Sequence, residues 1–108
     1  METAAPVIVF GYIRGDLNSM EMVRRQTLIE DKAAAAYSVK PDEVVIEPVV
    51  GQLQGFNRLL GALRFHLHGG SDVVVILNSR DDVGRTRWTQ DWALAQLNDM
   101  RVRVEYVT

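Results

Sequence analysis

The segment VFGYIRGDLN, residues 9–18, completes an apolar run that begins at Pro6 and places two charged residues, Arg14 and Asp16, near its end. A nearly continuous apolar run is typical of a parallel strand that helices cover on both faces. In open α/β sheets, the carboxyl end of such a strand faces the crevice where ligands bind. The segment therefore predicts a buried central strand with a candidate site at its end.

Strand-like runs alternate with segments of helical periodicity along the rest of the chain. The predicted strands cover residues 6–13, 43–50, 72–77 and 102–107. The predicted helices run from residue 18 or 19 to about 38, from 56 to about 68, and from about 86 to 97. This alternation predicts βαβ units. We therefore expect an α/β fold, a three-layer α/β/α domain with a central, mostly parallel four-stranded sheet. The alternating sequence RVRVEYV makes the last strand an edge strand.

The predicted helices carry start signals and apolar faces. Asn18 as the N-cap of the first helix places Glu21 at its third position, as in a capping box. In the second helix, four leucines are predicted to face the sheet. In the first helix, the predicted face combines apolar residues with a glutamine and a threonine. They are Leu59, Leu60, Leu63 and Leu67 in the second helix, and Met22, Val23, Gln26, Thr27, Ile29, Ala33 and Ala34 in the first. Trp88 and Trp92 lie one turn apart on the third helix. We expect them in the core, whereas an exposed pair would indicate a partner surface.

Length and composition limit the classes of protein to consider. The 108 residues form one domain, residues 1–108, and the net charge of −2 argues against nucleic-acid binding by bulk electrostatics, though a local basic patch is compatible with it. The chain has no cysteine, which excludes disulfide scaffolds and thiolate sites and is compatible with a cytoplasmic location. No apolar run approaches the roughly 20 residues of a membrane span. Residues 1–5 have no basic region and do not resemble a secretory signal.

Polar residues follow each of the first three predicted strands. Arg14 and Asp16 follow the first, Arg58 comes soon after the second, and Asp81 and Arg85 follow the third. If the first and third strands are neighbours, the side chains that follow them meet in one crevice. Arginines there would suit a phosphodiester, which they bind through paired hydrogen bonds. On spacing alone, a network of Arg–Asp ion pairs explains the same residues, and we rank it first.

Three segments of the chain resemble the catalytic domain of the serine recombinases, the resolvase and invertase family. They are VFGYIRGDLNSMEMVRRQ, NRLLGALRFHLHGGSDVVVILNSRDDVGR and LNDMRVRVEYV. In that family a strand ends in Tyr-x-Arg-x-Ser, the next helix contains a Gln, a loop after the second strand carries an Arg, and Asp-Arg-x-x-Arg follows the third strand. The matching positions here are Tyr12, Arg14, Gln26, Arg58, Asp81, Gly84 and Arg85.

Two positions depart from the family pattern. Asp16 stands where the family has its nucleophilic serine, and Asp82 stands where it has the first arginine after the motif aspartate. Family members attack a phosphodiester with the serine oxygen while arginines stabilise the developing charge. A carboxylate would instead repel the phosphate and form an acyl phosphate, which water hydrolyses. The resemblance therefore implies a resolvase-like domain with no intact catalytic set, which has lost DNA cleavage and recombination and acts as a binding or regulatory module.

Other functions remain open from the sequence. Asp16 and Asp81 could bind a divalent metal in a phosphoryl-transfer or nuclease-like enzyme whose arginines, Arg14, Arg58 and Arg85, hold the phosphate. Weak DNA binding without chemistry would depend strongly on salt. The chain ends at Thr108 without the family's helix-turn-helix domain, so we expect no sequence-specific DNA recognition. Self-association as a homodimer, or binding to a protein partner, is also open.

Metal and nucleotide sites have little support in the sequence. His66 and His68 lie two residues apart near a helix end with no third ligand at suitable spacing, so a contact with the helix C-terminus is favoured over zinc. Neither of the glycine-rich phosphate-binding motifs, GxGxxG and GxxxxGK[ST], occurs. We expect no resident cofactor and no metal site.

Overall fold

The computed structural model describes residues 6–49 and 52–108. Residues 1–5, where we predict no secretory signal, and Val50, the last residue of the predicted second strand, lie outside the described residues. The elements are, in order, β1 (Val7–Arg14), α1 (Ser19–Tyr37), β2 (Glu43–Glu47), α2 (Gln54–His68), β3 (Asp72–Leu77), the 3₁₀ helix η1 (Arg80–Val83), α3 (Arg87–Asp99) and β4 (Arg103–Tyr106). Among the helices of these described ranges, none has the length and apolar character needed to cross a membrane.

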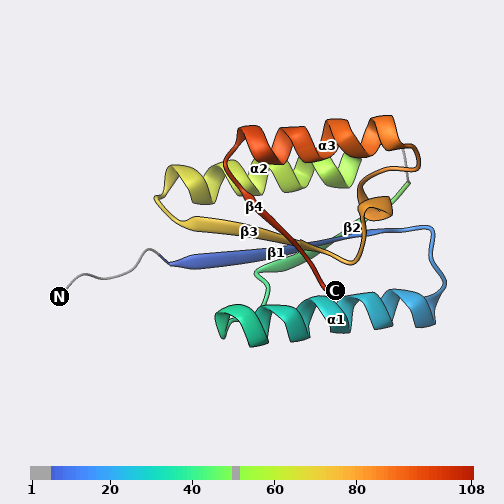
Figure 1. Ribbon diagram of the computed structural model, residues 1–108, viewed down its shortest axis with the longest axis horizontal. Coiled ribbons are helices and arrows are strands. Elements are labelled where there is room, and N and C mark those ends of the chain that lie inside the picture. The colour runs from blue at the N-terminus through green and yellow to red at the C-terminus, as the bar shows by residue number, and fades with distance from the viewer. Residues whose placement is uncertain (1–5, 50–51) are drawn as a thin grey trace.

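The four strands form one parallel sheet in the order β2-β1-β3-β4. Helix α1 covers one face of the sheet, and α2 and α3 cover the other (Figure 1). The predicted three-layer α/β fold is therefore confirmed, with every strand pair parallel and β4 at an edge. Strand β1 lies between β2 and β3, with Arg14 in register with Glu47 of β2. The end of β1 is therefore flanked by the ends of two neighbouring strands.

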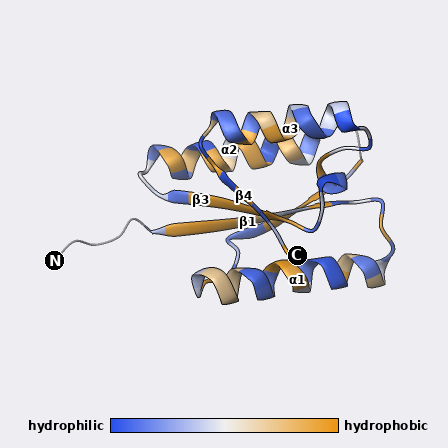
Figure 2. Cartoon of the chain, in the orientation of Figure 1, coloured by the Kyte–Doolittle hydropathy of each residue, from blue (hydrophilic) through white to orange (hydrophobic). Residues whose placement is uncertain are grey.

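Each face of the sheet has its own apolar core, and the apolar strands run between the two helical layers (Figure 2). The larger core joins one side of the sheet to α2 and α3 and includes Phe56, Leu63 and Leu97. The smaller core joins the other side to α1 and includes Ile29 and Ala33. The predicted leucine face of α2 is confirmed: three of its members are buried and Leu67 packs against them.

The predicted apolar face of α1 is wrong in part. Ile29 and Ala33 are buried, and Met22 packs against the same core, as expected. The other four residues assigned to that face are all exposed: Val23, Gln26, Thr27 and Ala34. Spacings of three and four residues do not by themselves identify the buried side of a long helix. In a helix of 19 residues, both the buried and the exposed side can contain residues at these spacings.

The expectation that both tryptophans lie in the core is also wrong. Trp88 is 76% exposed, and Trp92 is 37% exposed with its ring 6.0 Å from that of Phe56. The buried positions of α3 are instead Ala93 and Leu97. Ala93 and Leu97 occupy the sheet-facing positions of α3, which leaves Trp88 exposed to solvent and Trp92 at the side of the helix.

Candidate functional site

Charged side chains from five segments meet at the carboxyl ends of β1 and β3. Strand β1 and the loop after it supply Arg14 and Asp16, while η1 and the loop that follows it supply Asp81, Asp82 and Arg85. Helix α1 adds a further arginine. We call this set the strand-end cluster: Arg14, Asp16, Arg25, Asp81, Asp82 and Arg85. The structure thus brings together the four residues that the sequence places in one crevice, and adds Arg25 and Asp82 to them.

Arg14 is held from two sides by aspartates. Its Nε and Nη2 donate to the two carboxylate oxygens of Asp16 at 2.6 and 2.7 Å. Its Nη1 donates to Asp81 at 3.2 Å. Arg85 approaches the outer oxygen of Asp16 at 3.6 Å. The paired contact with Asp16 uses the guanidinium edge that a phosphate oxygen pair would use, so an internal carboxylate occupies the anion position of Arg14.

Asp82 is the buried centre of the cluster, with a side chain that is fully shielded from solvent. Its carboxylate accepts hydrogen bonds from the backbone N–H groups of Arg14, Asn78 and Ser79 at 3.2 to 3.3 Å. It also accepts from Nη1 of Arg25 at 2.9 Å. Asp82 therefore ties the end of β1, the end of β3 and helix α1 together. An arginine in this enclosed position would meet four donors and no acceptor among these groups.

Arg25 is a cluster residue that sequence reasoning missed. Its Nε donates to Glu21 at 3.0 Å, one turn earlier in α1, and its Nη1 reaches both Asp81 and Asp82. A signal for it was present in the sequence. Arg25 precedes Ile29 and Ala33 by four and eight residues, so it lies on the side of α1 that faces the sheet. A charged residue at such a position is expected to have a buried partner.

The cluster contains three arginines and three aspartates, so its formal charges cancel. The hydrogen bond from Arg14 lowers the pKa of Asp16 below its ordinary value. Burial opposes ionisation of Asp81, but Ser79, Arg25 and Arg14 outweigh it and lower the pKa of that carboxyl. Burial raises the pKa of Asp82, against the opposing effect of its hydrogen-bond donors and Arg25. The bound aspartates leave little positive potential for an added anion.

A second polar group lies under α2, next to the cluster. Tyr12 donates its hydroxyl to the buried carboxylate of Glu47, which also accepts from the backbone N–H groups of Gly55 and Phe56 at 2.7 and 3.0 Å. Burial and the Glu47 carboxylate raise the pKa of Tyr12. A small cavity of about 110 Å³ is lined by these two side chains and by residues of the loop before α3. Tyr12 thus helps to hold the carboxylate that supports the start of α2, and within the described residues its hydroxyl bonds to Glu47 and to no arginine.

Two residues matched to the family pattern lie outside the cluster. Gln26 is exposed on α1, and its side chain makes no hydrogen bond within the described residues. Arg58 is exposed on α2 and pairs with Glu43 at the start of β2, whereas the cluster lies at the strand ends. Of the three phosphate-binding candidates, the structure brings together Arg14 and Arg85 but not Arg58.

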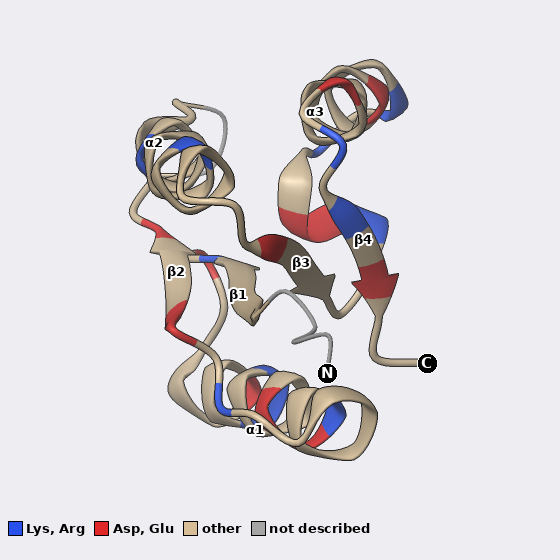
Figure 3. Ribbon diagram, turned by 90° about the vertical axis from the view of Figure 1, so that its left-hand side faces the viewer, with Lys and Arg blue, Asp and Glu red and all other residues tan. Residues whose placement is uncertain are grey.

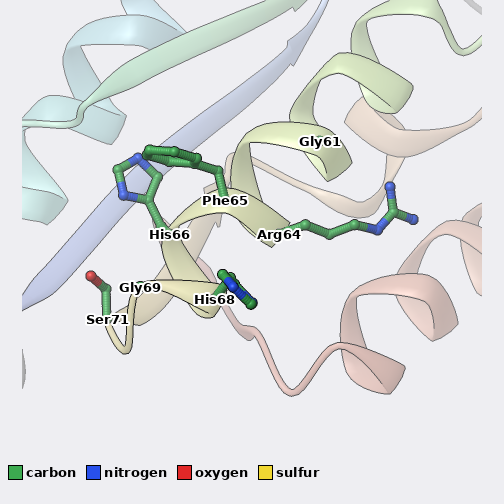
Figure 4. Close-up of a pocket in the computed structure, with 7 residues that line it drawn as sticks. All are labelled: Gly61, Arg64, Phe65, His66, His68, Gly69 and Ser71. Atoms are coloured by element: carbon green, nitrogen blue, oxygen red, sulfur yellow. The ribbon is translucent and has the colours of Figure 1, made fainter.

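The two histidines of α2 do not converge. They line an open hollow of about 570 Å³ at the C-terminal end of the helix, and Figure 4 shows their rings projecting in different directions. Residues two apart on a helix do not face each other. His66 approaches Asp42 at 3.4 Å, while His68 is exposed. Within residues 6–49 and 52–108, no group of three or more His, Cys, Asp or Glu side chains is placed to hold a metal ion.

Glu21 anchors the helix side of the cluster and gives it a pH dependence. Its hydrogen bonds with Arg24 and Arg25 lower its pKa from 4.5 to about 2. The stability that this ionised group contributes is therefore present above pH 4.5 and is lost as the pH falls through about 2. Asp16 and Asp81 act in the same direction, whereas the raised pKa of Asp82 partly offsets them, because its protonation favours the folded state.

We expect Glu21→Gln to flatten the acid-induced loss of stability between pH 4.5 and about 2, because glutamine does not titrate there. Urea unfolding midpoints measured from neutral pH downward check this. Glu30→Gln is the matched control, since Glu30 is exposed on the same helix and forms no ion pair within the described residues. An unchanged acid slope in Glu21→Gln would contradict the role given to this carboxylate.

The whole fold has a counterpart among solved structures. It matches the crystal structure of the C-terminal catalytic domain of ISC1926 TnpA, an IS607-like serine recombinase, with a TM-score of 0.69 and 19% sequence identity. The match covers 94% of this chain and 67% of that chain. No protein-family model and no curated protein matches the sequence. At this identity the likeness establishes a serine-recombinase-like fold.

Proposed function

We propose that the chain is a resolvase-like domain that has lost DNA strand cleavage and serves as a binding or regulatory module with, at most, weak nucleic-acid binding. One observation carries the proposal: Asp16, which the motif resemblance aligns with the family nucleophile, binds Arg14 with both carboxylate oxygens. The same side chain thus removes the nucleophile and fills the anion position of the arginine beside it.

The chemistry of strand exchange requires two things that this cluster does not offer. A serine ester with the DNA end must persist until religation, and a carboxylate would form an acyl phosphate that hydrolyses. Positive groups must also face the phosphate as its charge develops. Here Arg14 and Arg25 point at aspartates, and Arg85 is 3.6 Å from Asp16. Both requirements speak for a module without cleavage activity.

The arrangement gives less support to a metal-dependent phosphoryl-transfer enzyme. Asp16 is bound by Arg14, and Asp81 accepts from Ser79, Arg14 and Arg25. A divalent cation would have to displace guanidinium groups from both carboxylates, at a place where the arginines already neutralise the acids.

The test is fluorescence anisotropy with labelled duplex and single-stranded DNA over a salt series, with and without Mg²⁺, with the same samples run on a denaturing gel. We expect intact DNA and binding that is weak and falls steeply with salt, because few phosphate contacts are available. A covalent protein–DNA adduct, or strand cleavage, that disappears in Asp16→Ala would overturn the proposal. Cleavage that requires Mg²⁺ would establish the metal-dependent enzyme instead.

Asp16→Asn is expected to raise the affinity for duplex DNA several-fold at low salt and to steepen its salt dependence. The change removes a negative charge between Arg14 and Arg85 and frees their guanidinium groups for phosphate oxygens. Asp99→Asn is the matched control, because it changes the net charge equally at the far, C-terminal end of α3. Equal effects of the two substitutions would mean that Asp16 does not neutralise a phosphate site.

A further inference from the structure

The small cavity next to the strand-end cluster has buried acids in its lining. Its volume is about 110 Å³, and it lies where α2 and α3 begin, since its lining includes Leu53 before the one helix and Thr86 before the other. The two helices lie side by side over one face of the sheet, with α1 on the opposite face (Figure 3). Glu47 and Asp82, the two buried charged residues of the ranges 6–49 and 52–108, both line this cavity.

Glu47 is a buried carboxylate without a basic partner. Its hydrogen bonds come from Tyr12 and from the backbone N–H groups of Gly55 and Phe56, and no Lys, Arg or His side chain of the described residues forms an ion pair with it. The sequences of residues 1–5 and 50–51 contain no such side chain. A buried acid is usually paired with a cation, because taking a charge out of water is costly. The partial positive charge at the start of α2 meets only part of this need.

The basic residues around the cavity bind other acids. Arg85 lines the cavity, but its side chain is 63% exposed and approaches Asp16 at 3.6 Å. Arg25 binds Asp82, whose carboxylate also accepts from three backbone N–H groups. Of the two buried carboxylates in the lining, Glu47 is therefore the one that still lacks a positive partner.

We propose that the cavity binds an alkylammonium group, with the nitrogen donating to the Glu47 carboxylate and the hydrocarbon lying against Leu53 and Val83. A carboxylate offers about four acceptor positions, and the present donors to Glu47 occupy three of them. The fourth is on Oε2, which accepts one hydrogen bond whereas Oε1 accepts two. A hydrogen bond from an ammonium group to a carboxylate is of the strong, charge-assisted kind.

The lining favours this guest over a metal ion or an anion. A hard metal ion takes several oxygen ligands, and the described part of the chain contains no group of three or more side chains placed to supply them. An anion would face two carboxylates. Leu53 and Val83 instead suit a hydrocarbon chain. The cavity has space for roughly four non-hydrogen atoms, at the volume that a water molecule takes in the liquid. The n-propylammonium ion has this size.

Titration of the isotope-labelled protein with n-propylammonium chloride, followed by heteronuclear NMR, tests the site. We expect saturable shifts of the backbone N–H signals of Gly55 and Phe56, because both bind the Glu47 carboxylate. The expected Kd is on the order of 1 mM, as suits so small a ligand. The neutral analogue n-propanol is expected to bind at least tenfold more weakly. Potassium chloride at equal concentration controls for ionic strength and is expected to leave these signals unchanged.

The alkylammonium group has two natural sources, a free primary amine and the lysine side chain of a partner protein. Titration with Nα-acetyl-lysine methylamide separates them, because it carries the same group on a backbone that must stay outside the cavity. Binding as tight as that of n-propylammonium, or tighter, assigns the site to a lysine side chain. Weaker binding assigns it to a free amine.

Two variants locate the contact. Glu47→Gln removes the charge and keeps one oxygen for the start of α2, and we expect it to weaken amine binding at least tenfold. Val83→Leu adds one carbon to the lining, and we expect it to weaken binding severalfold by filling the cavity. Gly61→Ala, in the middle of α2 and outside the lining, is expected to leave the Kd unchanged. Circular dichroism and urea unfolding verify that each variant is folded.

Each contrary outcome is decisive. The absence of saturable shifts at amine concentrations far above the expected Kd overturns the proposal. Equal binding of n-propanol, or an unchanged Kd in folded Glu47→Gln, shows that the carboxylate does not hold the guest. An unchanged Kd in folded Val83→Leu places the amine outside the cavity. The proposal goes beyond the function proposed above, and its test contains no DNA, so the failure of one leaves the other standing.

Discussion

Gly15→Ala is expected to lower the free energy of unfolding by about 3 kcal/mol, at the upper end of the cost of overpacking. A Cβ at this position would lie 1.9 Å from the carbonyl oxygen of Glu47 and 3.0 Å from its carbonyl carbon. Backbone atoms cannot rotate out of the way as a flexible side chain can. The ends of β1 and β2 must therefore separate, which also displaces the carboxylate of Glu47 under α2. Urea unfolding with linear extrapolation measures the effect.

Gly61→Ala is the matched control, because it adds the same methyl group where there is room. Apart from its chain neighbours and the surrounding backbone of α2, no heavy atom of the described residues lies within 4 Å of a Cβ built at Gly61, which is an exposed position in the middle of the helix. Alanine is more favourable than glycine inside a helix by about 1 kcal/mol, so this variant is expected to be more stable than the wild type. Equal unfolding midpoints for Gly15→Ala and the wild type would show that β1 and β2 do not approach so closely in solution.

Asp82→Ala is expected to cost about 4 kcal/mol, as for removal of one partner from a buried ion pair. The change leaves Nη1 of Arg25 without its closest acceptor and removes the side-chain acceptor from three backbone N–H groups near the ends of β1 and β3. Asp81→Ala is the control within the same helical turn. Its side chain is 42% exposed, so its loss is expected to cost no more than about 1 kcal/mol. Similar losses in both variants would contradict the central role of Asp82.

Asp82→Arg separates the structural from the catalytic interpretation of this position. Arginine is the residue expected here from the motif that the sequence resembles, yet it would be enclosed beside Arg25 and the N–H of Arg14. We expect this variant to be less stable than Asp82→Ala and to gain no strand cleavage on a denaturing gel. A stable Asp82→Arg protein would show that the space around this side chain can open.

The fold was predictable because its signals are local and periodic. The run of residues 72–77 and the alternation of residues 102–107 predicted a central and an edge strand, and Asn18 accepts from the Glu21 N–H at 2.8 Å as the helix start required. Which apolar residues of a helix face the sheet and which face solvent was not predictable. Val23 and Trp88 are compatible with burial by type and spacing, and only the packing of α1 and α3 against the sheet leaves them outside.

The meeting of polar residues was predictable in part. The residues after the first and third strands were expected to meet only if those strands are neighbours. The sheet order makes β1 and β3 neighbours, and the residues lie there as an ion-pair network. Arg25 and Glu47 were missed for different reasons. Arg25 lies at four-residue spacing from Ile29 and Ala33, and only the apolar residues of this face were considered. The role of Glu47 depends on the position of α2 above β2, which no short stretch of sequence encodes.

Glu47 also makes strand β2 and helix α2, which are consecutive in the chain, interdependent. Helix α1 begins with its own cap, Asn18, and an acidic first turn. Helix α2 begins after Leu53, whose backbone has a left-handed conformation and whose side chain does not cap the helix. The N–H groups of Gly55 and Phe56, in the first turn, instead bind the Glu47 carboxylate at the end of β2. The start of α2 is thus completed only while β2 is paired with β1, whereas α1 needs no such support. Strand and helix form a single cooperative unit, and loosening of that sheet edge would fray the helix above it.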